Sequence, residues 1–114
     1  MMLAAGRLDR RVAVQQRDAG QDAAGQPLQT WSTVLTCWAA IEPLSTREFF
    51  GSQAMQSDVT HRITVRHHQV FADPRAAAAL RIVYQGRIFN LQVPHEIGRR
   101  EGFRILASEA LNDG

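Results

Sequence analysis

The chain has 114 residues, which is enough for a single domain over residues 1–114 with one modest hydrophobic core. Hydrophobic residues make up 45% and charged residues 21%, so wholesale disorder is excluded, and no apolar run reaches the length of a membrane span. The formal net charge of +2 is too small to indicate a nucleic-acid partner by itself. A single cysteine, Cys37, excludes an internal disulfide and a metal site built from cysteines alone.

The first third of the chain predicts two strands separated by a loop. Residues 11–16 alternate between apolar and polar side chains, as a half-buried strand does. Residues 18–27 contain two glycines and a proline but no large apolar group, which predicts an exposed loop. Residues 28–41 then form a long β-prone segment, which Pro43 is expected to end.

A capping box predicts the one helix of the chain. Ser45 and Glu48 have the spacing at which each side chain binds the other's backbone amide. Leu44 and Phe49 occupy the positions of a hydrophobic staple, so we expect a short helix over residues 46–56. It is expected to cover an end or a face of the β-barrel that the strands together predict, as argued below.

The segment 59–67 alternates most regularly of all. One face would carry its apolar residues and histidines, and the other would carry Thr60, Arg62, Thr64 and Arg66. This polar face is β-prone and has fork-shaped guanidinium donors, which suit an interface along a ring or a sheet edge. An ordinary solvated strand face is an equally good interpretation of the same pattern.

The last part of the chain predicts a turn, a hairpin and a final strand. Asp73 and Pro74 indicate a turn that leads into a helical turn of the alanine run. Strands at residues 80–84 and 87–93 flank Gln85-Gly86, a dipeptide suited to a tight hairpin, and a last strand is expected at residues 102–107. The fold class is therefore mainly β: a small closed or nearly closed β-barrel of about six strands, with one short helix and long loops.

The histidines do not predict a metal site. His61 and His67 share a strand face, but six residues of strand separate them by about 20 Å. His68 points away from His67, and His95 is expected in a loop after Pro94. Because zinc needs three or four ligands around one point, we expect no metal ion.

No catalytic site or cofactor is expected either. Cys37 lies inside a predicted strand, where cysteine is usually a small buried hydrophobic residue. The carboxylates form no close pair on one face, and no glycine-rich phosphate loop follows a strand. Nucleic-acid binding is limited by a lack of stacking surfaces, because the aromatic residues of the strands are expected in the core: Trp31, Trp38, Phe89 and Phe103.

A series of segments in a fixed order carries a resemblance to a known family. The series consists of residues 6–15, Gly25, Trp31, residues 38–44, residues 47–50, residues 60–66 and residues 81–89. This succession closely resembles the phage head–tail joining proteins, the head closure or stopper family of long-tailed phages, prophages and gene transfer agents. The resemblance extends from residue 6 to about residue 98, whereas residues 67–71, the alanine run and the last residues follow no pattern of the family.

The resemblance implies a structural protein of the virion and not an enzyme. Such proteins form a ring, here of about six or twelve copies, between the portal with its adaptor ring and the tail terminator. The ring closes the DNA channel after packaging and joins head to tail. The implied location is the head–tail interface of the virion, after assembly in the bacterial cytoplasm and without membrane contact. Contact with the packaged DNA end stays open, as do two alternatives: a tail-completion protein such as a tail terminator, or a small-barrel nucleic-acid-binding protein.

Three groups of residues are candidates for contacts with other subunits or partners. The exposed loop is the clearest, since loops without a core often order on binding. The predicted helix and the polar strand face are further candidates, with internal packing or plain exposure as alternatives. The residues are Gly20, Gln21, Asp22, Gly25 and Gln26 in the loop, Arg47, Phe49 and Phe50 in the helix, and Arg62, Thr64 and Arg66 in the strand.

Overall fold

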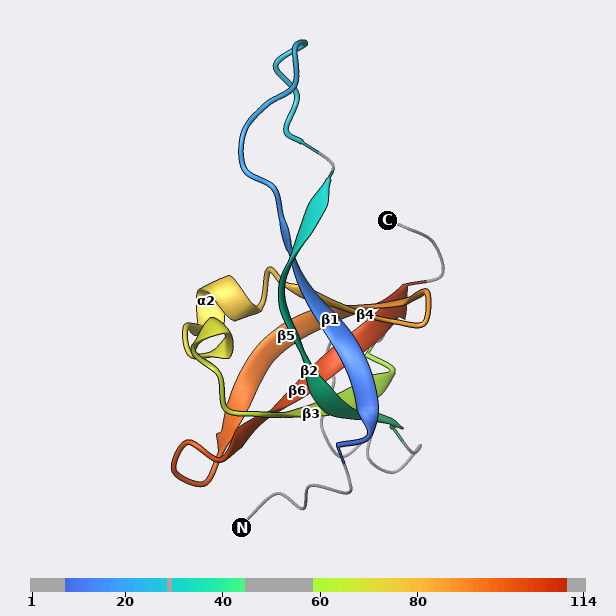
Figure 1. Ribbon diagram of the computed structural model, residues 1–114, viewed down its shortest axis with the longest axis vertical. Coiled ribbons are helices and arrows are strands. Elements are labelled where there is room, and N and C mark those ends of the chain that lie inside the picture. Colours follow the sequence, from blue (N-terminus) through green and yellow to red (C-terminus); the bar gives the residue numbers. More distant parts are fainter. Residues whose placement is uncertain (1–7, 29, 45–58, 111–114) are drawn as a thin grey trace.

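Residues 8–28, 30–44 and 59–110 are described by the computed structural model, and they form a closed antiparallel β-barrel (Figure 1). The six strands follow each other around the barrel in the order β1-β2-β3-β6-β5-β4. Their bounds are β1 (Arg10–Arg17), β2 (Trp31–Pro43), β3 (His61–Arg66), β4 (Arg81–Tyr84), β5 (Arg87–Ile97) and β6 (Gly102–Ala110). The predicted six-stranded barrel is confirmed.

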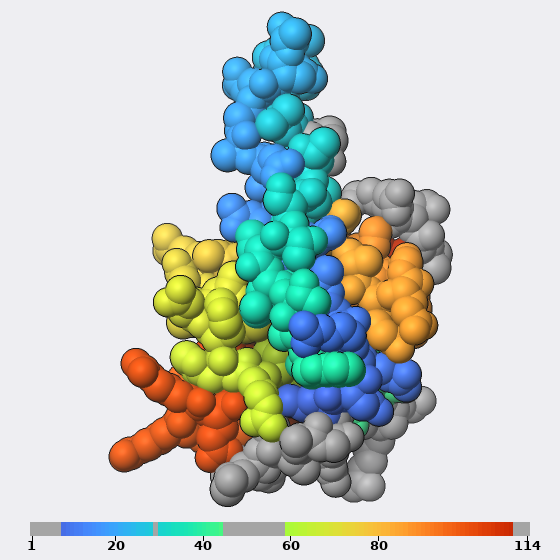
Figure 2. All heavy atoms as spheres, viewed as in Figure 1, coloured from blue at the N-terminus to red at the C-terminus, as the bar shows by residue number. Residues whose placement is uncertain are grey.

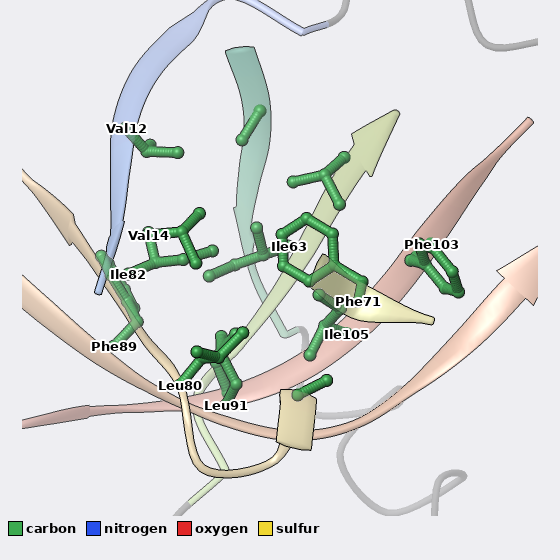
Figure 3. Packing of buried hydrophobic residues seen from close by; sticks show 14 residues of the cluster. Val12, Val14, Ile63, Phe71, Leu80, Ile82, Phe89, Leu91, Phe103 and Ile105 are labelled. Carbon is green, nitrogen blue, oxygen red and sulfur yellow. The ribbon is translucent and has the colours of Figure 1, made fainter. Parts of the chain in front are cut away.

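Strand alternation builds the core of the barrel. In β1, Val12 and Val14 are buried between more exposed neighbours, and β3, β5 and β6 contribute further buried side chains to the core. Figure 3 shows these side chains meeting inside the barrel, with the Phe71 ring near the centre of the view. The labelled members of the cluster are Val12, Val14, Ile63, Phe71, Leu80, Ile82, Phe89, Leu91, Phe103 and Ile105.

Two short helical segments lie between β3 and β4. The 3₁₀ turn η2 (Gln69–Phe71) buries Phe71, whose ring centroid lies 5.9 Å from that of Phe103. The helical turn α2 (Pro74–Ala77) begins after Asp73, whose side chain accepts a hydrogen bond from the Arg75 amide at 3.1 Å. This confirms the predicted turn and helical turn. The predicted helix over residues 46–56, with Arg47, Phe49 and Phe50, lies outside the described residues.

The β4–β5 hairpin turns as predicted. Gln85 and Gly86 both have positive φ, at 48° and 81°, which is the geometry of the two-residue turn that matches strand twist. The part of the chain that the structure describes contains no helix long and apolar enough to span a membrane.

Strand β5 extends further than the sequence predicts. It continues through Pro94 to Ile97, so His95 lies in a strand and not in the expected loop. The pairing of β5 with β6 shifts register between Leu91 and Pro94, and such irregularities admit a proline that a regular ladder would exclude. β6 also runs on beyond the predicted residue 107 to Ala110, where its residues 108–110 pair with residues 88–90 of β5.

Candidate functional site

The predicted loop between β1 and β2 is an arm that projects from the barrel. Figures 1 and 2 show this arm, residues 18–27, extending away from the barrel. The molecule with its arm measures 49 Å along its longest axis and 28 and 25 Å along the other two. Its tip is held by its own hydrogen bonds, since Asp22 Oδ1 accepts from the amides of Ala24 and Gln26, each at 2.9 Å. The tip carries the exposed residues Gly20, Gln21, Asp22, Gly25 and Gln26.

Hydrogen bonds at the base set the direction of the arm. Asp18 accepts from the Thr30 hydroxyl at 2.6 Å and from the Ser32 hydroxyl, and its amide donates to the Thr30 carbonyl at 2.9 Å. These two hydroxyl donors lower the pKa of the Asp18 carboxyl. The arm is therefore a continuation of the β1–β2 hairpin with internal hydrogen bonds at both its base and its tip.

The two tryptophans of β2 lie on the outside of the barrel. Trp38 is 50% exposed, and the guanidinium of Arg11 lies 5.2 Å from its ring centroid. Trp31 is half-buried beneath two guanidinium groups, that of Arg81 at 4.2 Å and that of Arg17 at 5.4 Å. The expectation that these tryptophans pack in the core is wrong, whereas Phe89 and Phe103 are buried as expected.

A β-bulge at Val34 explains why both tryptophans face outward. Val14 pairs with Leu35 while Gln15 pairs with Thr33, so Val34 is an extra residue in β2. Trp31 and Trp38 are seven positions apart and would point to opposite faces of a regular strand. The extra residue reverses the alternation, which places Trp31, Thr33 and Trp38 on the same outer face.

Neighbouring polar groups fix the orientation of Arg81 over Trp31. Its Nε donates to Gln15 Oε1 at 2.9 Å, and Gln15 Nε2 donates to Thr33 Oγ1 at 3.4 Å. We call this outer surface of β1, β2 and β4 the arginine–tryptophan face, defined by the residues Arg11, Arg17, Trp31, Trp38 and Arg81. Alternation of apolar residues did not reveal it, because the bulge leaves no sequence signal.

The arginines of this face differ in their partners from Arg62 and Arg87, which each pair with a glutamate. Arg87 makes a bidentate pair with Glu109, at 2.8 and 3.0 Å, and Arg62 lies 3.4 Å from Glu42. Within the described residues, no carboxylate lies within ion-pair distance of Arg11, Arg17 or Arg81.

The predicted polar face of β3 is only partly accessible. Arg66 is exposed and Arg62 is half-buried beside Glu42. Thr64 is 8% exposed, so its side chain is not available at the surface of the isolated chain. The interface role of this strand therefore stays a prediction that centres on Arg66.

Histidine and cysteine side chains line the barrel wall without forming a reactive cluster. His61 lies edge-on to Phe89 with ring centroids 5.1 Å apart, and His67 stacks on Phe103 at 5.3 Å. Burial raises the pKa of the Cys37 thiol, which disfavours the reactive thiolate. Nowhere in residues 8–28, 30–44 and 59–110 do three potential metal-ligating side chains gather.

Comparison with known proteins assigns a family to the chain. Residues 3–110 match the family model of the phage head completion protein. The solution structure of protein SF1141 from Shigella flexneri 2a is similar, with a TM-score of 0.75 and 28% identity over 96% of this chain and 98% of that one. No curated protein sequence matches the chain. The chain belongs to the phage head completion protein family and has a structural role in completing the phage head.

Proposed function

We propose that this protein forms a ring between the portal with its adaptor ring and the tail terminator, where it closes the DNA channel after packaging and joins head to tail. The observation that carries the proposal is a closed barrel from which a hydrogen-bonded arm projects. Membership in the head completion family supports contacts with other head and tail proteins.

The arm suits the requirements of a ring. Each subunit of a closed ring must present two different complementary surfaces, one to each neighbour. An arm fixed in direction at its base by Asp18 reaches beyond its own barrel and contacts a neighbouring subunit or the channel. The exposed arm tip and the exposed Arg66 of β3 are the surfaces that we assign to these contacts.

The role is mechanical and not enzymatic. The protein acts through its shape and its interfaces, in about six or twelve copies as the symmetry of portal and tail requires. It resides in the virion, and its assembly precedes docking of the tail.

The experiment is deletion of the gene from the producing strain, followed by negative-stain imaging of the particles. DNA-filled or leaking heads beside separate, finished tails are expected, and a plasmid copy of the gene should restore joined particles. Normal tailed particles would contradict the proposal. Free heads accompanied by abnormal tails would instead favour a tail-completion protein such as a tail terminator.

A further inference from the structure

The arginine–tryptophan face is an open surface. Trp38 is 50% exposed and Val34 is 43% exposed, whereas most large apolar side chains of the described barrel are buried. Figure 2 shows β1 and β2 side by side on the visible side of the molecule, with no other described element lying over them. From Trp31 to Trp38 the face extends for about 20 Å along the strand. The exposed Trp38 and Val34, together with the half-buried Trp31, make this face a candidate binding surface.

The guanidinium groups of the face are oriented by the indole rings but form no ion pair within residues 8–28, 30–44 and 59–110. Arg11, Arg17 and Arg81 each lie over an indole ring, which restrains the side chain and leaves the N–H groups at its edge free for a ligand. For Arg81 one donor is used by Gln15 and four remain. No carboxylate of the described residues lies within ion-pair distance of these three arginines, so an acidic group of another molecule would not have to displace one of them.

The partner that we consider binds this face through side chains. β2 pairs with β3 only from residue 39 to residue 43, so its residues 31–38 have a described partner strand on one side alone, which is β1. The outward side chains of β1, β2 and β4, and not the edge of a strand, are the recognition element that we assign.

The composition of the face favours a protein over a nucleic acid. Tryptophan and arginine beside small and aliphatic residues, here Ala13 and Val34, are typical of the centre of protein–protein interfaces. A nucleic-acid site needs several free aromatic rings for base stacking, but two guanidinium groups already lie over Trp31, which leaves Trp38 as the one exposed indole of this face. The formal net charge of +2 is also small for a phosphate-binding surface.

We propose that the arginine–tryptophan face binds an acidic surface of another virion protein, whose carboxylates pair with Arg11, Arg17 and Arg81 around an apolar contact with Trp38. This rests on the proposed function, which supplies the head and tail proteins as partners. It adds the surface used and the chemistry of the partner: aspartate or glutamate side chains flanking an apolar group that fits against the exposed indole.

The test measures co-sedimentation of purified protein with DNA-filled heads, and separately with free tails, both isolated from the gene-deletion strain. The variants are Trp38→Ala, Arg11→Glu and Arg11→Lys. Arg99→Glu is the matched control, since it makes the same charge change at an exposed residue of the β5–β6 turn. Far-UV circular dichroism and thermal unfolding establish that each variant is folded.

We expect wild-type protein to bind heads or tails, and Trp38→Ala and Arg11→Glu each to weaken that binding about tenfold or more. Arg11→Lys should weaken it less than Arg11→Glu, because it keeps the charge but loses the planar fork, and Arg99→Glu should bind like the wild type. Equal binding by wild type, Trp38→Ala and Arg11→Glu would overturn the inference while leaving the proposed function intact. Failure of the wild type to bind either particle would overturn both.

Two further measurements on the same proteins separate other occupants of the face. Binding of a single-stranded or duplex oligonucleotide, lost in Trp38→Ala and steeply dependent on salt, would make the face a nucleic-acid site and overturn the inference. Loss of self-association in Trp38→Ala, measured by analytical ultracentrifugation, would make it a contact between copies and also overturn it.

Discussion

His61 is the first residue of β3, and its surroundings disfavour protonation of its imidazole ring. Its ring is edge-on to Phe89, and its Nδ1 lies 2.8 Å from the Thr60 hydroxyl oxygen. Burial lowers the pKa of His61 below its ordinary value of 6.5, with a smaller lowering by Arg87 and an opposing attraction from Glu109.

The lowered pKa predicts acid sensitivity. Below about pH 6.5 the unfolded chain binds a proton at His61 that the folded chain resists, so the free energy of unfolding falls as the pH drops through this range. Urea unfolding at about pH 7.5 and 5.5 should show a larger loss of stability for the wild type than for His61→Gln. The same loss in both proteins would show that His61 does not contribute to acid sensitivity.

At the scale of elements, the bulge in β2 determines which face each tryptophan occupies. Deleting Val34 would bring Trp31 and Trp38 to an even spacing, so a regular strand would still place both outside. We therefore expect this deletion to leave the protein folded, with well-dispersed amide resonances. Its melting temperature should stay within a few degrees of the wild type.

Deletion of Thr64 is the contrasting variant. β3 pairs with β2 and β6 in unbroken register, so loss of Thr64 would turn either Ile63 or Val65 out of the core. This deletion should prevent stable folding or lower the unfolding free energy by about 2 kcal/mol or more. Similar melting temperatures for the two deletion variants would contradict the assigned bulge.

The elements that follow simple periodicity were predictable, and those that depend on an interruption were not. Period-two alternation identified β1 and β3, and the Gln85-Gly86 turn placed the β4–β5 hairpin. The bulge at Val34 has no sequence signal, so the outward position of Trp31 and Trp38 was missed, and with it the arginine–tryptophan face. The extension of β5 beyond Pro94 was missed for the same reason.

The accessibility of candidate site residues also depended on tertiary structure. The composition of the loop was sufficient to predict that Gly20 and Asp22 are exposed, because no side chain in that segment can join a core. Thr64 has the alternation of a surface residue and is nevertheless buried. Burial of that kind arises from packing by distant parts of the chain, which strand periodicity does not describe.

At the scale of the whole molecule, we expect the barrel to determine the stability of the fold and the arm to contribute to head–tail joining. The tip of the arm is held by its own hydrogen bonds and adds nothing to the cluster of buried core residues. Replacing residues 19–27 by a two-residue Asn-Gly turn should leave the melting temperature within a few degrees of the wild type and abolish head–tail joining in a complementation assay. A shortened protein that still joins heads to tails would show that the arm makes no essential contact.

Charge reversal on β3 tests the second surface that we assign to the ring. Arg66 is an exposed residue at the end of β3, so Arg66→Glu should fold normally. It should reduce the yield of joined particles, because the new carboxylate of residue 66 would face the neighbouring subunit. There it would either be repelled by the acidic group that paired with Arg66 or be buried without a cation. Wild-type yield from Arg66→Glu would remove β3 from the proposed interface.

The most direct test of the ring is a cryo-electron microscopy reconstruction of the neck of mature particles. The proposed function predicts a ring of copies of this barrel between the portal with its adaptor ring and the tail terminator, with the arms reaching neighbouring subunits or the channel. A neck that is resolved without this barrel, or with the barrel placed elsewhere in the particle, would contradict the proposal.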